Sequence, residues 1–104
     1  MAEPYAINIT DQAARHLDGP SRYAQGIVLD GIELHLRHQT TQETRRIKLL
    51  RLNPVASWEL RLGDYRVLYD VAEEERLVNV LVVGEKRGNR LHVQGKEFTA
   101  HESD

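Results

Sequence analysis

Two arginines in the stretch WELRLGDYRVLYDV, residues 58–71, are spaced so that they face each other across a β-hairpin. With Gly63-Asp64 as a two-residue turn, Arg61 lies opposite Arg66, and glycine in the first turn position predicts a type II′ turn. Like charges directly opposite each other in an antiparallel pair are destabilising. Guanidinium groups are permanently charged and can donate two hydrogen bonds to one carboxylate or phosphate. The pair therefore predicts either a compensating carboxylate within the protein or an anion bound from outside.

Because side chains alternate along a strand, the hairpin has an apolar face and a polar face. The apolar face carries Trp58, Leu60, Leu62, Tyr65, Val67, Tyr69 and Val71. The polar face carries Glu59, Arg61, Arg66, Leu68 and Asp70. Glu59 or Asp70 could bridge the arginines as a surface ion network, which would stabilise the fold little. Trp58, Tyr65 and Tyr69 share the apolar face with valines and leucines, so we predict that they are core residues rather than base-stacking platforms.

The charge of the chain is distributed unevenly. Residues 37–66 carry a net charge of +4 and the remainder carries −6, which together give the net charge of −2. A basic middle in an acidic protein is a possible binding surface for a polyanion. From charge alone we favour the simpler interpretation, in which these side chains form solvated strand and loop faces.

The first third of the sequence predicts a strand followed by two helices. Residues 5–9 alternate between apolar and polar side chains, and Thr10-Asp11 can cap a helix that runs to about Leu17. A second helix is expected from about Ser21 to Arg37, with an apolar stripe at helical spacing. The stripe runs through Ala24, Val28, Ile32 and His35/Leu36. Gly26 and Gly31 weaken this helix or allow something to pack closely against it.

The rest of the chain predicts strands. One is expected over residues 46–52, before Asn53-Pro54, and the hairpin follows. After the charged turn Glu73-Glu74-Glu75, residues 77–83 are apolar on both faces, which is typical of a strand that is covered on both sides. Gly84 is expected to begin a basic turn that leads into a short strand or helix. The order β-α-α-β-β-β-β predicts an α+β fold: a small twisted antiparallel sheet with the helical pair packed on one face.

The size and composition are typical of a single soluble domain spanning residues 1–104, in which residues 99–104 are expected to fray. The absence of cysteine excludes disulfides and thiolate metal sites, and it fits a reducing compartment. The first ten residues lack the features of a signal peptide, and no apolar stretch approaches the length of a membrane span. We therefore expect a cytoplasmic protein.

The hairpin and the segment after it resemble the RelE/ParE superfamily of bacterial toxins from type II toxin–antitoxin systems. The resemblance rests on WELRLGDYRVLYDV, an acidic turn, an apolar strand ending in VVG and the basic segment EKRGNR. It covers most of the chain and is strongest over residues 54–90. The family fold, a small twisted antiparallel sheet with an N-terminal helical pair, agrees with the order of elements predicted above.

The resemblance implies two different activities. RelE-like toxins are ribosome-dependent endoribonucleases that cut mRNA without a metal or other cofactor, and ParE-like toxins inhibit DNA gyrase without hydrolysis. A third possibility is a non-toxic relative that only binds its antitoxin. In each case the resemblance implies a cognate antitoxin as partner, with the ribosome and mRNA, or gyrase, as the target.

RNA cleavage needs a base for the 2′-hydroxyl proton, an acid for the leaving oxygen and cations for the charge that develops on phosphorus. The resemblance implies that four residues share these tasks as the catalytic set: Arg61, Arg66, Lys86 and His92. It implies a further set that binds the substrate: Arg46, Lys48, Arg87 and Arg90. Arg66 falls at the phosphate-binding position of the family nucleases, and His92 falls near a position that supplies a tyrosine or histidine. The alternative for His92 is an ordinary histidine on a half-exposed strand.

Two features of the sequence argue against a nuclease. Glu59 stands where RelE-like enzymes often carry a second lysine, and it repels phosphate unless it serves as the base. The chain is also acidic overall, whereas toxins that act on ribosomes are usually basic. His35 and His38 are spaced for a metal, but cations near a helix C-terminus are favoured without one, so we expect no metal site.

Overall fold

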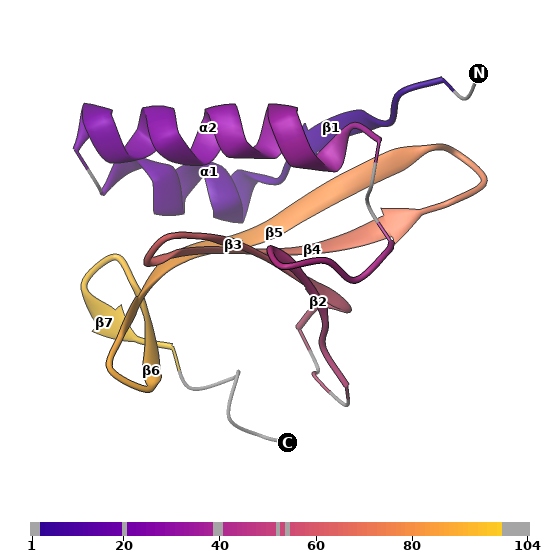
Figure 1. The fold of residues 1–104 in the computed structure, drawn as a ribbon. Coiled ribbons are helices and arrows are strands. Elements are labelled where there is room, and N and C mark those ends of the chain that lie inside the picture. Colours follow the sequence, from indigo (N-terminus) through magenta and orange to yellow (C-terminus); the bar gives the residue numbers. More distant parts are fainter. Residues whose placement is uncertain (1–2, 20, 39–40, 52, 54, 99–104) are drawn as a thin grey trace.

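The computed structural model describes residues 3–19, 21–38, 41–51, 53 and 55–98, and they form one sheet covered by two helices (Figure 1). In chain order the elements are β1 (Ala6–Ile9), α1 (Asp11–Asp18), α2 (Arg22–Leu36), β2 (Ile47–Leu49), β3 (Trp58–Leu62), β4 (Tyr65–Ala72), β5 (Leu77–Arg87), β6 (Arg90–Val93) and β7 (Lys96–Glu97). The predicted α+β class, with its sheet and its N-terminal helical pair, is confirmed. The predicted fraying of residues 99–104 and the predicted strand end at Leu52 lie outside the described residues.

The sheet has seven strands, in the order β2-β3-β4-β5-β6-β7 with β1 beside β5. All neighbours along this order are antiparallel, whereas β1 pairs with β5 in parallel, from Ala6↔Leu77 to Ile9↔Val80. The expectation of a wholly antiparallel sheet is thus wrong for β1. Parallel neighbours need a long crossover connection, and the helices and strands between residues 9 and 77 provide it.

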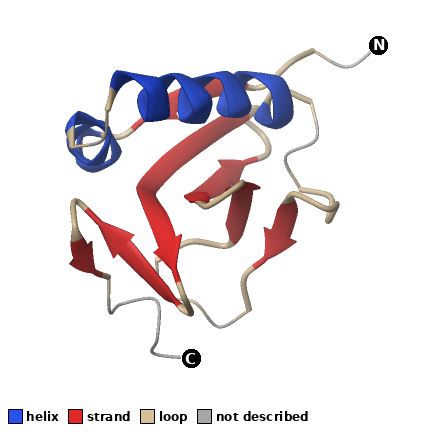
Figure 2. Ribbon diagram, turned by 60° about the vertical axis from the view of Figure 1, so that its left-hand side comes forward, coloured by secondary structure: helices blue, strands red, loops and turns tan. Residues whose placement is uncertain are grey.

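Thr10 caps α1 as predicted, and Ser21, the expected start of the second helix, caps α2. The hydroxyls of Thr10 and Ser21 accept hydrogen bonds from the backbone N–H groups of Ala13 and Ala24, each at 3.2 Å. Such caps satisfy donors that have no partner within the helix. Both helices lie on the same side of the sheet (Figures 1 and 2). They cover the face that the alternation in the hairpin marked as apolar.

Each face of the sheet carries its own hydrophobic core. The core under the helices includes Leu60, Leu62, Val67 and Tyr69 of the hairpin, with Trp58 and Tyr65 packed against it. A smaller core on the opposite face contains Ala56, Leu68, Val82, Leu91 and Val93. Both predictions, the apolar face of the hairpin and the doubly covered strand at residues 77–83, are therefore confirmed.

The prediction for Gly84 is wrong, because β5 does not end there but continues to Arg87. Gly84 pairs with Arg66 of β4, and a Cβ atom on it would lie 2.6 Å from the carbonyl oxygen of His92. The glycine thus marks a close approach of β6 to β5 rather than a turn. The turn follows at Gly88, with φ +62°, so that Lys86 lies on a strand.

Candidate functional site

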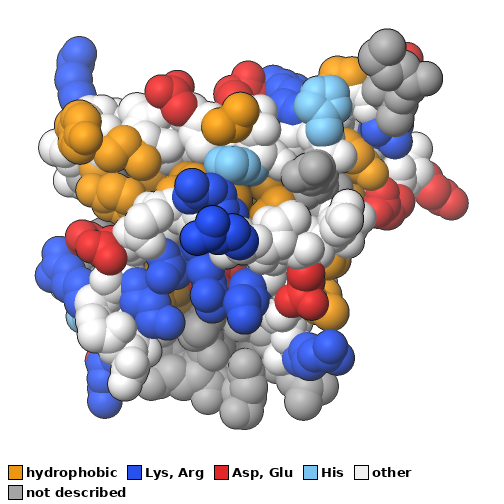
Figure 3. All heavy atoms as spheres, viewed as in Figure 1, with side chains coloured by type: hydrophobic (Ala, Val, Ile, Leu, Met, Phe, Trp, Pro, Cys, Tyr) orange, Lys and Arg blue, Asp and Glu red, His pale blue; other side chains and the backbone are white. Residues whose placement is uncertain are grey.

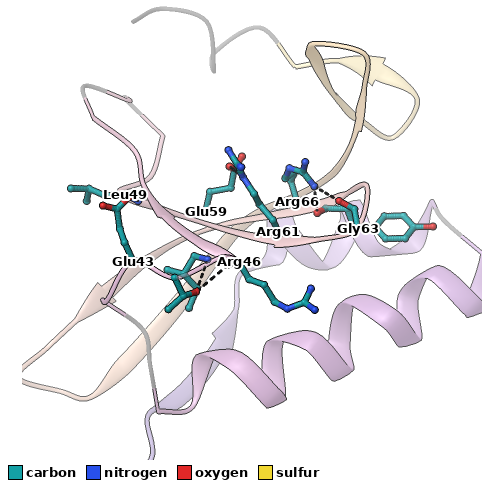
Figure 4. A network of polar contacts seen from close by, with 10 residues as sticks. Glu43, Arg46, Leu49, Glu59, Arg61, Gly63 and Arg66 are labelled. Carbon is teal, nitrogen blue, oxygen red and sulfur yellow. Dashed lines mark hydrogen bonds and ion pairs between the residues drawn. The ribbon is translucent and has the colours of Figure 1, made fainter.

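The hairpin of β3 and β4 has the predicted register. Arg61 pairs with Arg66, and Leu62 pairs with Tyr65 across the turn. Gly63 has a φ of +62°, and Asp64 is not among the described residues with a positive φ. A type II′ turn requires a positive φ at its first central residue only. The two arginines extend from the side of the hairpin that faces away from the helices (Figure 4).

The like charges of the pair are compensated mainly at Arg61. Its Nε atom lies 3.1 Å from Oε1 of Glu59, whose side chain is only 8% exposed. Asp70 instead accepts a hydrogen bond from the backbone N–H of Ser57 at 2.6 Å. Of the two predicted carboxylates, Glu59 therefore bonds to one arginine and Asp70 bonds to neither.

Arg66 is held by carbonyl groups of its own hairpin. One terminal nitrogen donates to the carbonyl of Gly63 at 2.5 Å and to that of Tyr65 at 2.9 Å. Its Nε atom is buried and has no hydrogen-bond partner among the described residues. The turn thus positions the guanidinium. None of the ion pairs formed by the described residues joins it to a carboxylate.

The sheet places Lys86 on the same face as the two arginines. Arg66 pairs with Gly84, and Lys86 follows two residues later on β5, so it is the diagonal neighbour of Arg66 on one face. Its backbone N–H donates to the carbonyl of Asp64 at 2.7 Å, which ties this part of β5 to the hairpin turn. Lys48 of β2 is the cross-strand partner of Glu59 and so shares the face as well.

The other four predicted site residues are not brought to this face. His92 pairs with Glu85, and its neighbours Leu91 and Val93 point into the core on the face of Arg66, so His92 points to the helix side. Its Nδ1 atom is buried without a hydrogen-bond partner among the described residues. Arg87 pairs with Glu85 at 3.2 Å, and Arg90 pairs with Glu97 at 2.7 Å. The sheet therefore separates these three side chains from Arg61, Arg66 and Lys86.

Arg46, the fourth of these residues, precedes β2 and extends toward α2, away from Arg61 and Glu59 (Figure 4). It lines two cavities that meet at the edge of the hairpin. One of about 360 Å³ is lined by Arg45, Arg46, Arg61 and Gly63. The other, of about 390 Å³, lies between α2, the hairpin turn and β5. Figure 3 shows Lys and Arg side chains gathered in the middle of this side of the molecule, below the helices.

Two histidines have a pKa below the ordinary value. Burial, and to a smaller extent the charge of Arg15, lower the pKa of His16. Burial, and then the charge of Arg46, lower the pKa of His35, which lines the 390 Å³ cavity. Nδ1 of His16 accepts a hydrogen bond from the backbone N–H of Val83 at 3.2 Å, which requires an unprotonated nitrogen.

Glu85 and Asp64 are two carboxylates that line the 390 Å³ cavity, and neither is among the site residues predicted from the sequence. A strand that ends at Gly84, as predicted, puts Glu85 in a turn. Extending the strand in register with the hairpin would have paired Glu85 with Tyr65 and placed it beside the turn. Tyr65, predicted to be a core residue, does pack against the core but also lines this cavity.

Among the described residues, no three or more His, Asp or Glu side chains are close enough together to hold a metal ion. Within the same part of the chain, no helix is long and apolar enough to cross a membrane.

The fold is similar to that of two solved toxin–antitoxin structures. A chain of the RelBE2 toxin–antitoxin complex from Mycobacterium tuberculosis superposes with a TM-score of 0.68 and 26% sequence identity, covering 80% of this chain and 99% of that one. A chain of the archaeal RelE–RelB complex from Pyrococcus horikoshii gives a TM-score of 0.64 and 22% identity, covering 81% and 96%. No sequence-family profile matches the chain, and no curated protein does. The chain has the fold of the RelE toxin family.

Proposed function

We propose that this protein is the toxin of a toxin–antitoxin module and that it cleaves mRNA on the ribosome. The observation that carries the proposal is the grouping of Arg61, Arg66 and Lys86 on one face of a sheet with the RelE fold. Three cations on one face suit the negative charge that develops when a 2′-hydroxyl attacks the neighbouring phosphate. An activity on ribosomes also places the protein in the cytoplasm.

We assign the roles within the site from its geometry. Arg66, which is not neutralised by a carboxylate, is assigned to the scissile phosphate, and Lys86 beside it adds a second cation. His92 lies across the sheet, so it does not take the proton in our assignment. Glu59 is a buried carboxylate on the same face as Arg61, and we assign it the role of the general base. Arg61 then orients Glu59 as well as contacting phosphate.

An antitoxin is the partner that we propose. The chains with this fold from M. tuberculosis and P. horikoshii were both solved in complexes described as toxin–antitoxin or RelE–RelB. A cognate antitoxin of this protein would therefore bind it and suppress its activity.

The test is primer extension on mRNA held in purified, programmed ribosomes. We expect the wild type to cut in the decoding site and Arg66→Ala to cut at least about 10²-fold more slowly, since its charge stabilises the additional negative charge that develops in the transition state. The matched control is Arg22→Ala, which removes an exposed arginine from the first residue of α2, on the helix side of the sheet. Circular dichroism of each variant checks that the fold is kept.

Intact message at high concentrations of the wild type would contradict the proposal. The Glu59–Arg61 ion pair favours a specific alternative in that case, because an arginine already bound to a carboxylate is less available to phosphate. The alternative is a toxin without hydrolytic activity that inhibits DNA gyrase, and a supercoiling assay would test it.

A further inference from the structure

The two cavities at the edge of the hairpin share two lining residues and differ in chemistry. We call them the arginine cavity, lined by Arg45, Arg46, Arg61 and Gly63, and the tip cavity, which lies between α2, the hairpin turn and β5. They share Arg46 and Gly63, so they adjoin at the hairpin turn. Arg46, which directly precedes β2, extends toward α2 (Figure 4).

The arginine cavity suits a phosphate. Its volume is about 360 Å³, and three of its four lining residues are arginines. Glu59 compensates Arg61, while none of the ion pairs formed by the described residues includes Arg45 or Arg46. Guanidinium groups without a carboxylate partner bind phosphate oxygens through paired hydrogen bonds.

The tip cavity suits a flat heterocycle that carries hydrogen-bond donors. Its volume of about 390 Å³ is within the usual range of small-molecule pockets. Ile27, Leu62 and Tyr65 supply apolar walls, and Asp64 and Glu85 supply carboxylates. Both hydrogen bonds that Arg87 donates to Glu85 end on Oε1. Within the described part of the chain, Oε2 of Glu85 therefore remains able to accept a bond from a ligand.

We propose that these cavities together bind one nucleotide, with its phosphate in the arginine cavity and its base in the tip cavity. The anionic phosphate of a nucleotide matches the arginines of one cavity, and the donors of its base match the carboxylates of the adjoining cavity. Bases are read on their Watson–Crick edges when they are unstacked, and a carboxylate there accepts hydrogen bonds from amino groups. Guanine offers two adjacent donors, N1–H and the N2 amino group, adenine and cytosine offer one amino group, and uracil offers only an N3–H flanked by two carbonyl oxygens that repel a carboxylate. Guanine is the preferred base and uracil the least favoured.

An acidic peptide is a poorer match, because its carboxylates meet Asp64 and Glu85 in the tip cavity. The inference rests on the proposed function only for the source of the nucleotide, which is either a segment of RNA or a free nucleotide. Binding is therefore measured without ribosomes, so that it is independent of cleavage.

The experiment follows backbone amide shifts of the full ¹⁵N-labelled chain during titration with guanosine 3′-monophosphate and uridine 3′-monophosphate. We expect shifts centred on Ile27, Gly63 and Glu85, and a guanine-to-uracil preference of about tenfold, the size of one good base contact. Glu85→Gln is expected to reduce that preference to about twofold or less. Arg46→Ala is expected to weaken both nucleotides equally and to keep their ratio.

The matched control is Glu33→Gln, which makes the same charge change on α2 outside both cavities and should leave the preference unchanged. Asp64→Asn tests the second carboxylate, so that the proposal does not depend on one variant. Equal affinity for the two nucleotides, shifts centred elsewhere, or an unchanged preference in both carboxylate variants would overturn the proposal.

Two hexaribonucleotides, UUGUUU and UUUUUU, identify the source. Much tighter binding of UUGUUU than of guanosine 3′-monophosphate assigns the site to RNA, and equal binding assigns it to a free nucleotide. Guanine-specific binding without mRNA cleavage would support this inference and contradict the proposed function. If the wild type cleaves mRNA, Arg66→Ala does not, and the protein shows no base preference, the proposed function is supported and this inference is contradicted.

Discussion

Among the individual residues, Glu59 is notable as a buried carboxylate on the cationic face of the candidate site. Its side chain is 8% exposed, and among the described residues it forms an ion pair with Arg61. A buried carboxylate is costly unless it is paired, so the pair explains how an acidic side chain is kept beside several cations. The same pair reduces the positive charge that a phosphate would meet. Under the function that we propose, Glu59 would therefore weaken substrate binding while serving proton transfer.

We expect Glu59→Gln to separate these two effects. Removing the negative charge should strengthen the binding of a 12-nucleotide RNA about two- to fivefold at low salt and steepen its salt dependence, because Arg61 becomes available as a further phosphate contact. Cleavage on the ribosome should fall at least about 10²-fold, since the base is lost. Fluorescence anisotropy and primer extension measure the two effects.

The control for this prediction is Glu97→Gln, which removes a carboxylate that pairs with Arg90 on the other face of the sheet. It should change neither quantity. Unchanged cleavage by Glu59→Gln would show that Glu59 is only a counter-ion of Arg61.

At the scale of elements, the contact of α2 with β3 depends on one glycine. A Cβ atom on Gly31 would lie 2.5 and 2.6 Å from the two Cδ atoms of Leu62, which is a buried core residue. Gly26 of the same helix has nothing within 4 Å of such an atom. The sequence alone does not distinguish the two glycines. Only Gly31 is required for close packing, and it positions the end of β3 that leads into the hairpin turn.

Alanine substitutions at these two sites should have opposite effects on stability. Gly26→Ala should raise the free energy of unfolding by about 0.5–1 kcal/mol, because alanine is the better helix former. Gly31→Ala gains the same propensity but must displace Leu62, so we expect a net loss of about 1–2 kcal/mol. Urea unfolding followed by circular dichroism measures both. Equal stabilisation of the two variants would mean that Leu62 moves aside at no cost.

Across the whole molecule, burial shifts the pKa of titratable side chains and so affects how the free energy of unfolding depends on pH. Tyr69 is fully buried in the core under the helices, and burial raises its pKa, so it stays neutral over the accessible range. His16 is the titrating group that joins α1 to β5, through the bond from Val83. Because burial lowers its pKa, the folded state binds a proton less readily than the unfolded chain does.

We predict that acidification destabilises the protein partly through His16. The contribution of the neutral imidazole is complete above the unfolded pKa of about 6.5 and is lost as the pH falls toward the lower folded value. Free energies of unfolding measured from pH 7.5 to 5 should fall more steeply for the wild type than for His16→Gln, which keeps an acceptor but does not titrate. Parallel curves would exclude this role. His35→Gln corrects for the second histidine with a lowered pKa.

Local structure can be predicted from the amino-acid sequence alone. The caps at Thr10 and Ser21, the stripe of α2 and the register of the hairpin all follow from interactions between residues close in sequence. Turn chemistry and side-chain periodicity are enough to place Arg61 opposite Arg66, and the resemblance built on that hairpin led to the observed fold.

Features that depend on contacts between distant segments required the three-dimensional structure. The parallel pairing of β1, the extension of β5 through Gly84, and the position of His92 on the helix side of the sheet all depend on strands brought together from far apart. If β5 ended at Gly84, the sequence would not define the side of the sheet on which Lys86 and Glu85 lie. Side chains alternate between the two sides only within a continuous strand. The bond between Glu59 and Arg61 and the two cavities at the hairpin edge likewise depend on side-chain directions and on α2. These features depend on packing between segments that are distant in the sequence, and a local pattern of residue types does not specify such packing.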